Sequence, residues 1–319
     1  MKIAILDDYQ DCVRGLACFG KLRGHDVRIL HETVADPQQL AERLDGVEAL
    51  VLIRERTRLT RALIERLPAL RAVSQTGRAG PHIDVAACSE RRIAVLGGAG
   101  SPYAPAELTW ALVLAASRGV AHEAAALRAG RWQTMLGRTV RGRTLGILGY
   151  GNIGRLVAGY GRAFGMNVLA FGREASLRRA ADDGVAVAAS RAELFAGSDV
   201  LSVHLRLVPE TRGSIGAEDF SAMRAGSLFV NTSRAELVAP GALAAALDAG
   251  QPGAAALDVF ESEPTLTNPL IAHPAVLATP HIGYVERDSY ELYFGTAFDN
   301  LVAFAAGQPT GLVNPEAFA

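Results

Sequence analysis

Three glycines at positions 149, 151 and 154 form the motif of this chain whose spacing points most directly to chemistry. They follow the apolar run Thr144–Leu148 and precede a helical pattern over Arg155–Phe164. Between a strand and a helix, Gly149 permits a tight turn, Gly151 lets the backbone approach a pyrophosphate, and Gly154 lets helix and strand approach each other. Glycine-rich turns also serve purely structural ends, but a motif with these flanks predicts dinucleotide binding.

The two residues after the next apolar run bear on which dinucleotide binds. Asn167–Phe171 reads as a strand, and Gly172 stands where a carboxylate would otherwise bind the ribose 2′-hydroxyl. Gly172 removes a charge that would repel a 2′-phosphate, and the guanidinium of Arg173 could bind one. The pair favours NADP(H) as cofactor. If Arg173 is solvated and Gly172 only ends the strand, NAD(H) is the alternative.

Three later segments place polar residues where an apolar run gives way to a loop. They are Asn231–Arg234, Leu257–Pro264 and Thr279–Gly283. Open α/β sheets bind their ligands outside the carboxyl ends of the strands. Taken singly, an arginine after a strand is more often a surface residue, a glutamate before proline a turn residue, and a lone histidine a core imidazole. Their joint occurrence after a dinucleotide loop indicates a catalytic site.

The elements that must position these residues alternate between short β-branched runs and stretches of helical period. This alternation predicts βαβ units, and it occurs in two series. We expect an α/β fold of two Rossmann-like, doubly wound parallel-sheet domains, one flavodoxin-like and one dinucleotide-binding, with a cleft between them. The expected boundaries are residues 1–99 plus 284–319 for the substrate domain and 100–283 for the dinucleotide-binding domain. The predicted strands are Lys2–Leu6, Val27–Leu30, Ala49–Ile53, Arg71–Ser74, Ile93–Val95, Thr144–Leu148, Asn167–Phe171, Val200–His204, Leu228–Asn231, Ala254–Leu257 and Val276–Ala278.

Composition excludes several classes of function. The 319 residues are 50% hydrophobic, which is enough for a large core, and 32 Lys plus Arg balance 33 Asp plus Glu without a dense basic stretch. A nucleic-acid partner is therefore not expected. The apolar run Met1–Leu6 is too short for a signal peptide, and the apolar segment 108–116 is too short to span a bilayer. We expect a cytoplasmic protein with no membrane partner.

The cysteines and histidines show no spacing typical of a metal site. Cys12, Cys18 and Cys88 form no C-x-x-C pair, and the seven histidines form no HExxH motif. We expect core or surface thiols in a reducing compartment, no disulfide framework and no bound metal.

The motifs together resemble the D-2-hydroxyacid dehydrogenase family. The matching segments are GYGNIG at 149–154, Ser198–Leu205, Pro209–Gly213 and the three strand-end segments, in the family's order over nearly the whole chain. The resemblance implies an enzyme that transfers hydride between a nicotinamide cofactor and a small 2-keto or D-2-hydroxy acid. It implies that Arg234 is the cation for the substrate and that His281 is the acid/base. Glu263 would orient His281 and favour its protonated form.

The resemblance also implies further contacts with the cofactor. The backbone of Asn152 and Ile153 would meet the pyrophosphate, and His204, Thr232 and Asp258 would line the nicotinamide and its ribose. A structural hydrogen-bonding carboxylate at the strand end is the alternative role for Asp258.

The expected substrate loop departs from the family pattern, which usually has a small apolar residue between two glycines. Here the loop reads Gly77-Arg78-Ala79, and its amides are expected to bind the substrate carboxylate. Arg78 either binds a second acidic group or points outward. Arg54, after the strand Ala49–Ile53, is a candidate for substrate recognition, with a solvated loop charge as the alternative. These departures leave the identity of the acid open.

Two other functions are alternatives on the same fold. A corepressor-like, dinucleotide-sensing regulator on the same fold would need a partner-binding surface or tail that the sequence does not show. The other is a dehydrogenase whose substrate is not a hydroxy acid. The resemblance further implies a homodimer in which residues 120–136 form an arm, the alternative being an ordinary helix pair within one subunit.

Overall fold

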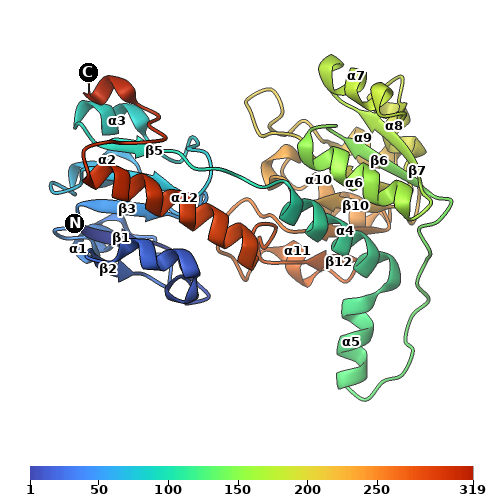
Figure 1. Ribbon diagram of the computed structural model, residues 1–319. Coiled ribbons are helices and arrows are strands. Elements are labelled where there is room, and N and C mark those ends of the chain that lie inside the picture. The colour runs from blue at the N-terminus through green and yellow to red at the C-terminus, as the bar shows by residue number, and fades with distance from the viewer. Residues whose placement is uncertain (319) are drawn as a thin grey trace. The chain divides into compact units, whose positions relative to one another are not determined.

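The structure is a computed structural model that describes residues 1–318 (Figure 1). It contains two compact units, one built from Met1–Ser101 together with the chain from Val285 onward, the other from Pro102–Tyr284. The sequence placed these joints after residues 99 and 283. Each unit has its own parallel sheet, so the predicted α/β class with two parallel-sheet domains is confirmed.

The smaller unit is a five-stranded parallel sheet in the order β2-β1-β3-β4-β5. Its central strands are covered on both faces, as in other parallel sheets, and all four residues of β3 and all four of β4 are buried. The edge strand β2 is partly exposed. The strands are β1 Lys2–Ile5, β2 Asp26–Ile29, β3 Ala49–Leu52, β4 Ala72–Gln75 and β5 Ala94–Leu96. The helices are α1 Pro37–Arg43, α2 Arg61–Glu65, α3 Val85–Glu90 and α12 Arg287–Ala305, with 3-10 turns at Val13–Gly15, Ala17–Leu22 and Pro315–Phe318.

Helix α12 completes the smaller unit from the far end of the chain. It packs against β4 and β5, where the Ser74 hydroxyl donates to the carbonyl oxygen of Ala297 at 2.9 Å. The amide nitrogen of Asn300 donates to the carbonyl oxygen of Gly97 at 3.0 Å. In Figure 1 the red helix accordingly lies against the blue and cyan strands. The predicted helix over 288–306 therefore belongs to the unit formed by the first hundred residues.

The larger unit is a seven-stranded parallel sheet in the order β12-β11-β10-β9-β6-β7-β8. The order reverses at β6, which lies between β9 and β7, and such a switch point is where open α/β sheets bind ligands. The strands are β6 Thr144–Leu148, β7 Asn167–Phe171, β8 Ala186–Val187, β9 Val200–Val203, β10 Leu228–Asn231, β11 Ala254–Leu257 and β12 Val276–Ala278. The helices are α4 Tyr103–Arg118, α5 Val120–Arg128, α6 Asn152–Ala163, α7 Glu174–Asp182, α8 Arg191–Gly197, α9 Ala217–Ala222, α10 Ala242–Asp248 and α11 Pro269–Ala272, with a 3-10 turn at Ala235–Leu237.

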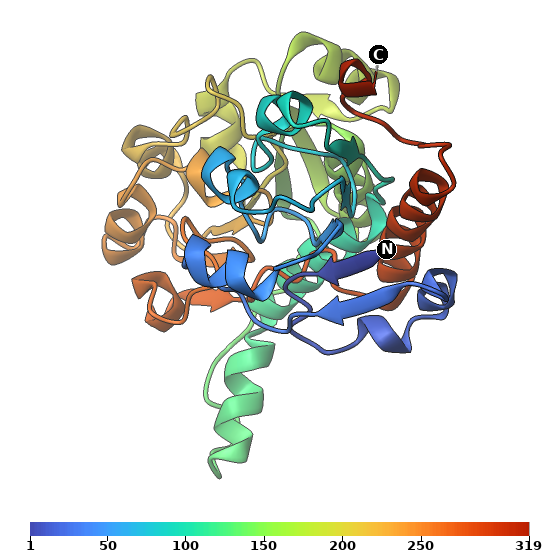
Figure 2. The same cartoon turned by 90° about the vertical axis from the view of Figure 1, so that its left-hand side faces the viewer.

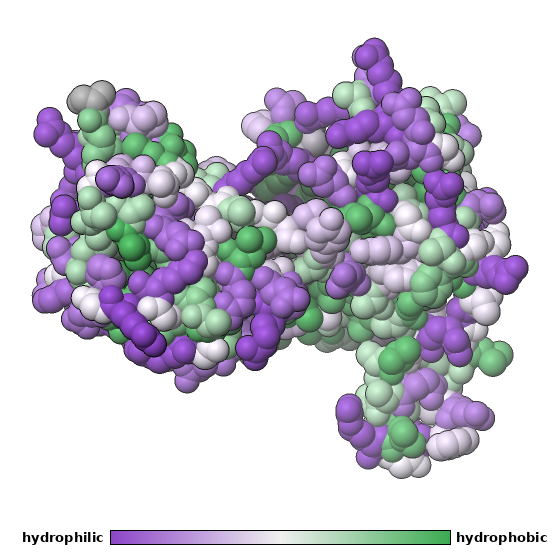
Figure 3. Space-filling view, in the orientation of Figure 1, coloured by the Kyte–Doolittle hydropathy of each residue, from purple (hydrophilic) through white to green (hydrophobic). Residues whose placement is uncertain are grey.

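Helix α5 and the segment that follows it form an arm that extends away from the rest of the larger unit (Figure 1 and Figure 2). The turn into α5 is made by Gly119, which has a left-handed φ of 62°. Several apolar side chains of this arm face solvent, with Trp132 77% and Leu136 95% exposed. Figure 3 shows the resulting hydrophobic patches on the arm. Within residues 1–318, no helix combines the length and the apolar character that crossing a bilayer requires.

Candidate functional site

The glycine loop joins β6 to α6, as the sequence predicted. Gly149 has φ 100°, and a side chain there would lie 2.7 Å from the carbonyl oxygen of His204. A side chain on Gly154 would overlap the carbonyl oxygen of Gly149, so α6 and the loop after β6 can approach this closely only because residue 154 is glycine. A side chain on Gly151 would meet nothing within 4 Å, so this position opens onto free space. Asn152 and Ile153 form the first turn of α6, whose amides are free to bind an anion.

The end of β7 lies beside this loop. The N–H of Gly149 donates to the carbonyl oxygen of Phe171 at 2.8 Å. A side chain on Gly172 would lie 3.6 Å from the Cα of Gly149. Arg173 is exposed at the N-cap of α7. The structure therefore brings both residues to the edge where the glycine loop lies.

His204 follows β9 at the same edge; the residue is half-buried, and its Nδ1 atom is buried. Burial lowers the pKa of this imidazole to about 3, so the ring is neutral. Its Nε2 lies 2.9 Å from the Ser202 hydroxyl, while Nδ1 is buried without a hydrogen-bond partner among the residues described. A buried ring nitrogen without a protein partner fits a site that a bound group completes. Together with the open space at Gly151, it makes this edge suitable for a dinucleotide.

Glu263 and His281 are brought together by the loops after β11 and β12. The Glu263 carboxylate lies 2.5 Å from Nδ1 of His281, and its other oxygen accepts from the N–H of Phe260 at 2.8 Å. The carboxylate is thus fixed at both oxygens and sets the orientation of the imidazole. His281 has φ 52°, and its ring stacks edge-on against Tyr284 with 5.6 Å between ring centroids. A non-glycine residue held in the left-handed region is typical of functional loops.

Asp258 holds the loop that carries His281. Its carboxylate accepts from the N–H of Ile282 at 2.8 Å, from the N–H of Gly283 at 2.8 Å, and from the Thr279 hydroxyl at 2.6 Å. Burial raises the pKa of this carboxyl group, while these hydrogen bonds oppose the rise. The hydrogen bonds of the structural role of Asp258 are therefore present. The expected contact of Asp258 with the cofactor would be additional to them.

Arg234 follows β10, the neighbour of β11. Asn231 shapes the turn, since its side chain donates to the carbonyl oxygen of Arg234 at 2.9 Å and accepts from the N–H of Ser233 at 3.0 Å. The Thr232 hydroxyl lies 2.7 Å from that of Thr109 on α4. Strands β10, β11 and β12 are adjacent and parallel. The loops that carry Arg234, Glu263 and His281 therefore lie at the same edge of one sheet. Glu263 and His281 are in direct contact.

The predicted substrate residues lie at the carboxyl ends of β3 and β4 in the smaller unit. Arg54 follows β3 and has φ 53°, and Gly77 follows β4 with φ 98°. Arg78 is exposed and Ala79 is half-buried. Sequence reasoning missed the residues around Arg54, of which Gln75 and His82 are buried. Only the polar character of a residue at the end of an otherwise apolar strand could have drawn attention to Gln75.

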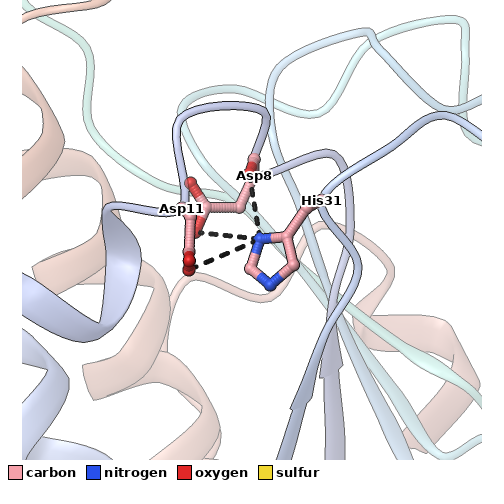
Figure 4. Close-up of side chains that lie close together, drawn as sticks. All are labelled: Asp8, Asp11 and His31. Carbon is pink, nitrogen blue, oxygen red and sulfur yellow. Dashed lines mark hydrogen bonds and ion pairs between the residues drawn. The ribbon is translucent and has the colours of Figure 1, made fainter.

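One group of possible metal ligands is present in residues 1–318, although the sequence predicted no metal site. Asp8, Asp11 and His31 place ligand atoms within 4.8 Å of one another (Figure 4). The buried Asp8 carboxylate already accepts from the N–H groups of Cys12 at 3.2 Å and Val13 at 3.1 Å. Asp8 therefore has a structural role in the turn after β1. All three cysteines are free thiols.

Comparison with known families gives one match that covers more than half of the chain. The model of the family described as D-isomer specific 2-hydroxyacid dehydrogenase, NAD binding domain, matches residues 110–283. This range contains the glycine loop and the strand ends that carry Arg234, Glu263 and His281.

Characterised relatives and a solved structure extend the similarity beyond that domain. A glyoxylate reductase from Aeropyrum pernix is 41% identical over 266 residues, which are 80% of this chain and 79% of that protein. A D-3-phosphoglycerate dehydrogenase from Methanocaldococcus jannaschii is 36% identical over 249 residues, 77% of this chain but only 47% of the relative. The crystal structure of a phosphoglycerate oxidoreductase from Vibrio cholerae has a TM-score of 0.94 at 53% identity, covering 96% of this chain and 99% of that one.

Proposed function

The chain belongs to the D-isomer specific 2-hydroxyacid dehydrogenase family, and we propose that it uses Arg234, Glu263 and His281 to interconvert a 2-keto acid and a D-2-hydroxy acid. Members of this family are oxidoreductases that use a nicotinamide cofactor, which supplies the hydride when bound. The observation that carries the proposal is the 2.5 Å contact of Glu263 with His281 at the sheet edge that also bears the glycine loop. Relatives named as reductases and dehydrogenases support this function over a dinucleotide-sensing regulator.

Each residue has a defined role in the proposal. The guanidinium of Arg234 binds the substrate and stabilises negative charge on the keto oxygen. Nε2 of His281 donates a proton to that oxygen during reduction and accepts it during oxidation, because Glu263 occupies Nδ1. In the smaller unit, the amides of Gly77, Arg78 and Ala79 bind the substrate carboxylate.

The direct test is an assay of the purified protein with NADPH and NADH. The panel contains glyoxylate, hydroxypyruvate, 3-phosphohydroxypyruvate and larger 2-keto acids, since the relatives' names include both a glyoxylate reductase and a phosphoglycerate oxidoreductase. We expect oxidation of the reduced cofactor with at least one of these acids and a D-hydroxy product. Tight cofactor binding without turnover of any acid would instead support the regulator.

A methyl group at Gly151 is expected to weaken cofactor binding without disturbing the fold. A side chain there meets no protein atom within 4 Å, so it would occupy space that the pyrophosphate needs. We expect Gly151→Ala to raise the dissociation constant for the reduced cofactor at least about 10-fold, equivalent to about 1.4 kcal/mol, in a fluorescence titration. Gly159→Ala, in the helix that follows, also meets no atom within 4 Å and is the matched control. Equal affinity of the two variants would contradict a pyrophosphate at this loop.

We propose NADP(H) as the preferred cofactor, with Gly172 and Arg173 beside the adenine ribose. Support comes from the small residue at position 172 and the exposed guanidinium of Arg173 at the N-cap of α7. Arg173→Ala is expected to lower kcat/KM with NADPH about 10-fold while leaving NADH unaffected, since a charge-assisted hydrogen bond to the phosphate is lost. Arg179→Ala, on the same helix, is the control. Equal loss with both cofactors would contradict the assignment.

We further propose a homodimer, in the cytoplasm, joined through the arm at residues 120–136. The exposed apolar side chains of this arm support it, because large apolar patches on a surface mark interaction sites. Light scattering after size exclusion should give twice the mass of one chain. Leu136→Glu in the arm should shift the protein toward the monomer, and Leu266→Glu, equally exposed but outside the arm, should not.

A further inference from the structure

The backbone of the loop that carries His281 is closely fixed. The φ of His281 is 52°, in the left-handed region, which is strained for a residue with a side chain. Its N–H donates to the carbonyl oxygen of Thr279 at 3.0 Å, and the N–H groups of Ile282 and Gly283 each donate to the Asp258 carboxylate at 2.8 Å. Strain of this kind persists where the surroundings enforce it, and it gathers at active sites.

The side chain of His281 needs more than the fixed backbone and Glu263 to be fully oriented. The Glu263 carboxylate contacts Nδ1 at 2.5 Å, whereas the proposed proton donor is Nε2, across the five-membered ring. A hydrogen bond at Nδ1 fixes the position of that atom but leaves the ring room to tilt, and a tilt displaces Nε2. Because the His281 side chain is 27% exposed, the contacts on its covered side decide the tilt.

The ring of Tyr284 supplies a contact on that covered side. The centroids of the two rings lie 5.6 Å apart, and the ring planes are inclined at 80° to each other. Aromatic rings at such distances favour this edge-to-face arrangement over a face-to-face stack. Tyr284 is only 6% exposed, so its ring cannot swing out into solvent. The imidazole is therefore held at Nδ1 by a carboxylate and against one side of the ring by a buried phenol.

The position of Tyr284 is set by the same carboxylate that holds the loop of His281. A side chain on Gly283 would lie 3.2 Å from the Asp258 carboxylate and 3.7 Å from Cβ of Pro105 in the first turn of α4. The backbone at residue 283 is thus confined between Asp258 and α4, and the N–H of Gly283 is bound as well. His281 and Tyr284 therefore share one anchor, which keeps the distance between their rings constant.

We propose that Tyr284 is a positioning residue for proton transfer: its ring fixes the tilt of the His281 imidazole and thereby directs Nε2 toward the keto oxygen. The inference rests on the proposed function. Proton transfer requires Nε2 within hydrogen-bond reach of the reacting oxygen. A reacting group misplaced by about 1 Å can slow a reaction about 10²-fold, so small tilts matter. Position 284 accordingly requires an aromatic ring.

Steady-state kinetics on the best substrate of the panel test this role. Tyr284→Leu is expected to lower kcat about 10-fold, as a misplacement of less than 1 Å would. The KM of the acid and the dissociation constant of the reduced cofactor should stay near those of the wild type, since other residues bind both molecules. Tyr284→Phe keeps the ring and should retain the kcat of the wild type.

Two results of these assays would overturn the role of the ring. One is an unchanged kcat in Tyr284→Leu. The other is an equal loss in Tyr284→Phe and Tyr284→Leu, because the hydroxyl group and not the ring would then be needed. If Tyr284→Leu does not fold, Tyr284→Met replaces it, since methionine fills irregular space with a flexible chain and provides no ring.

A double-variant cycle separates positioning of the imidazole from a general structural effect. In a His281→Asn background no imidazole remains to be oriented, so adding Tyr284→Leu should cause no further loss of kcat. A structural effect would act whether or not residue 281 is histidine. Losses in kcat that multiply in the double variant therefore overturn the positioning role.

Phe164→Leu is the matched control. Phe164 makes an edge-on contact with Trp110 in the same unit, with 5.0 Å between ring centroids. Removing this ring should leave kcat at the value of the wild type, even where it lowers Tm. A fall in kcat equal to that of Tyr284→Leu would overturn a specific role for Tyr284, because the loss of any aromatic contact would then suffice.

Nuclear magnetic resonance of protein labelled with ¹³C in its histidines gives a readout that does not depend on turnover. The signals of His281 are those that His281→Asn removes. Because a nearby aromatic ring shifts proton signals, Tyr284→Leu should move them further than Tyr284→Phe does. A wild type that turns over no acid overturns the proposed function, and the positioning role with it, even where these signals show the ring contact. An active wild type whose kcat and His281 signals do not respond to Tyr284→Leu overturns the role of Tyr284 alone.

Discussion

Asparagine in place of His281 is expected to lower kcat by about 10²- to 10⁴-fold, the usual contribution of a positioned general acid or base. The side chain of asparagine can still hydrogen-bond with Glu263, so the loop should keep its shape. It cannot deliver a proton to the keto oxygen. Cofactor affinity, measured by fluorescence titration, should stay near that of the wild type because the glycine loop is untouched.

His273→Asn is the control for this substitution. His273 lies in the same unit, where its Nδ1 accepts from the N–H of Ala275 at 3.1 Å, away from the strand-end loops that carry Arg234 and His281. It should leave kcat unchanged. Glu263→Gln should lower kcat by less than His281→Asn, since an amide retains part of the hydrogen bonding but not the charge. If His281→Asn kept full turnover, the imidazole would have no part in proton transfer.

Alanine in place of Arg234 is expected to lower kcat/KM by about 10²- to 10³-fold, comparable to the loss of one oxyanion-stabilising donor. The guanidinium would contact both the bound acid and the charge that develops on its keto oxygen, so KM should rise and kcat should fall. Arg234→Lys should recover only part of the loss, because a lysine ammonium lacks the planar pair of donors. Steady-state kinetics on the best substrate of the panel measures both effects.

Arg212→Ala provides the comparison for Arg234. Arg212 is an exposed arginine of the same unit. Its Nη1 lies 3.9 Å from the Glu236 carboxylate, and an exposed ion pair of this length contributes little to stability. It should match the wild type in kcat and KM. Full recovery of activity in Arg234→Lys would mean that charge alone matters, which contradicts binding through a guanidinium fork.

The two sheets could be predicted from the sequence because most strands are short runs of mainly apolar residues bounded by turn residues. The exception is β8, which was not predicted. Ala186–Val187 is two residues long and both are exposed, so no hydrophobic pattern marks it. The glycine loop was predictable for a different reason, since its function depends on backbone approach and thus on residue type.

Contacts between residues that are distant in the sequence were harder to predict from the sequence. Glu263 and His281 are 18 residues apart, and their pairing follows from the parallel order of β11 and β12. For Asp258 the sequence left two roles open; the hydrogen bonds to the loop at 279–283 are those of the structural role, and the contact with the cofactor stays a prediction. The hydrogen bonds of the Gln75 side chain with His82 and with the backbone of Arg54 could not be predicted. Tertiary packing decides which buried polar groups become partners, and residues 76–84 show no periodic pattern that would indicate it.

The smaller unit is built from two stretches of chain, one before and one after the residues of the larger unit. Val95 donates its N–H to the side chain of Asn314 at 2.8 Å, and Ser74 bonds to Ala297, so partners more than two hundred residues apart complete one core. During synthesis on the ribosome, residues 102–284 can emerge and fold as a unit before α12 exists. Until α12 is synthesised, the face of β4 and β5 that it covers stays exposed in the first hundred residues. Chaperones would protect this exposed surface during that period.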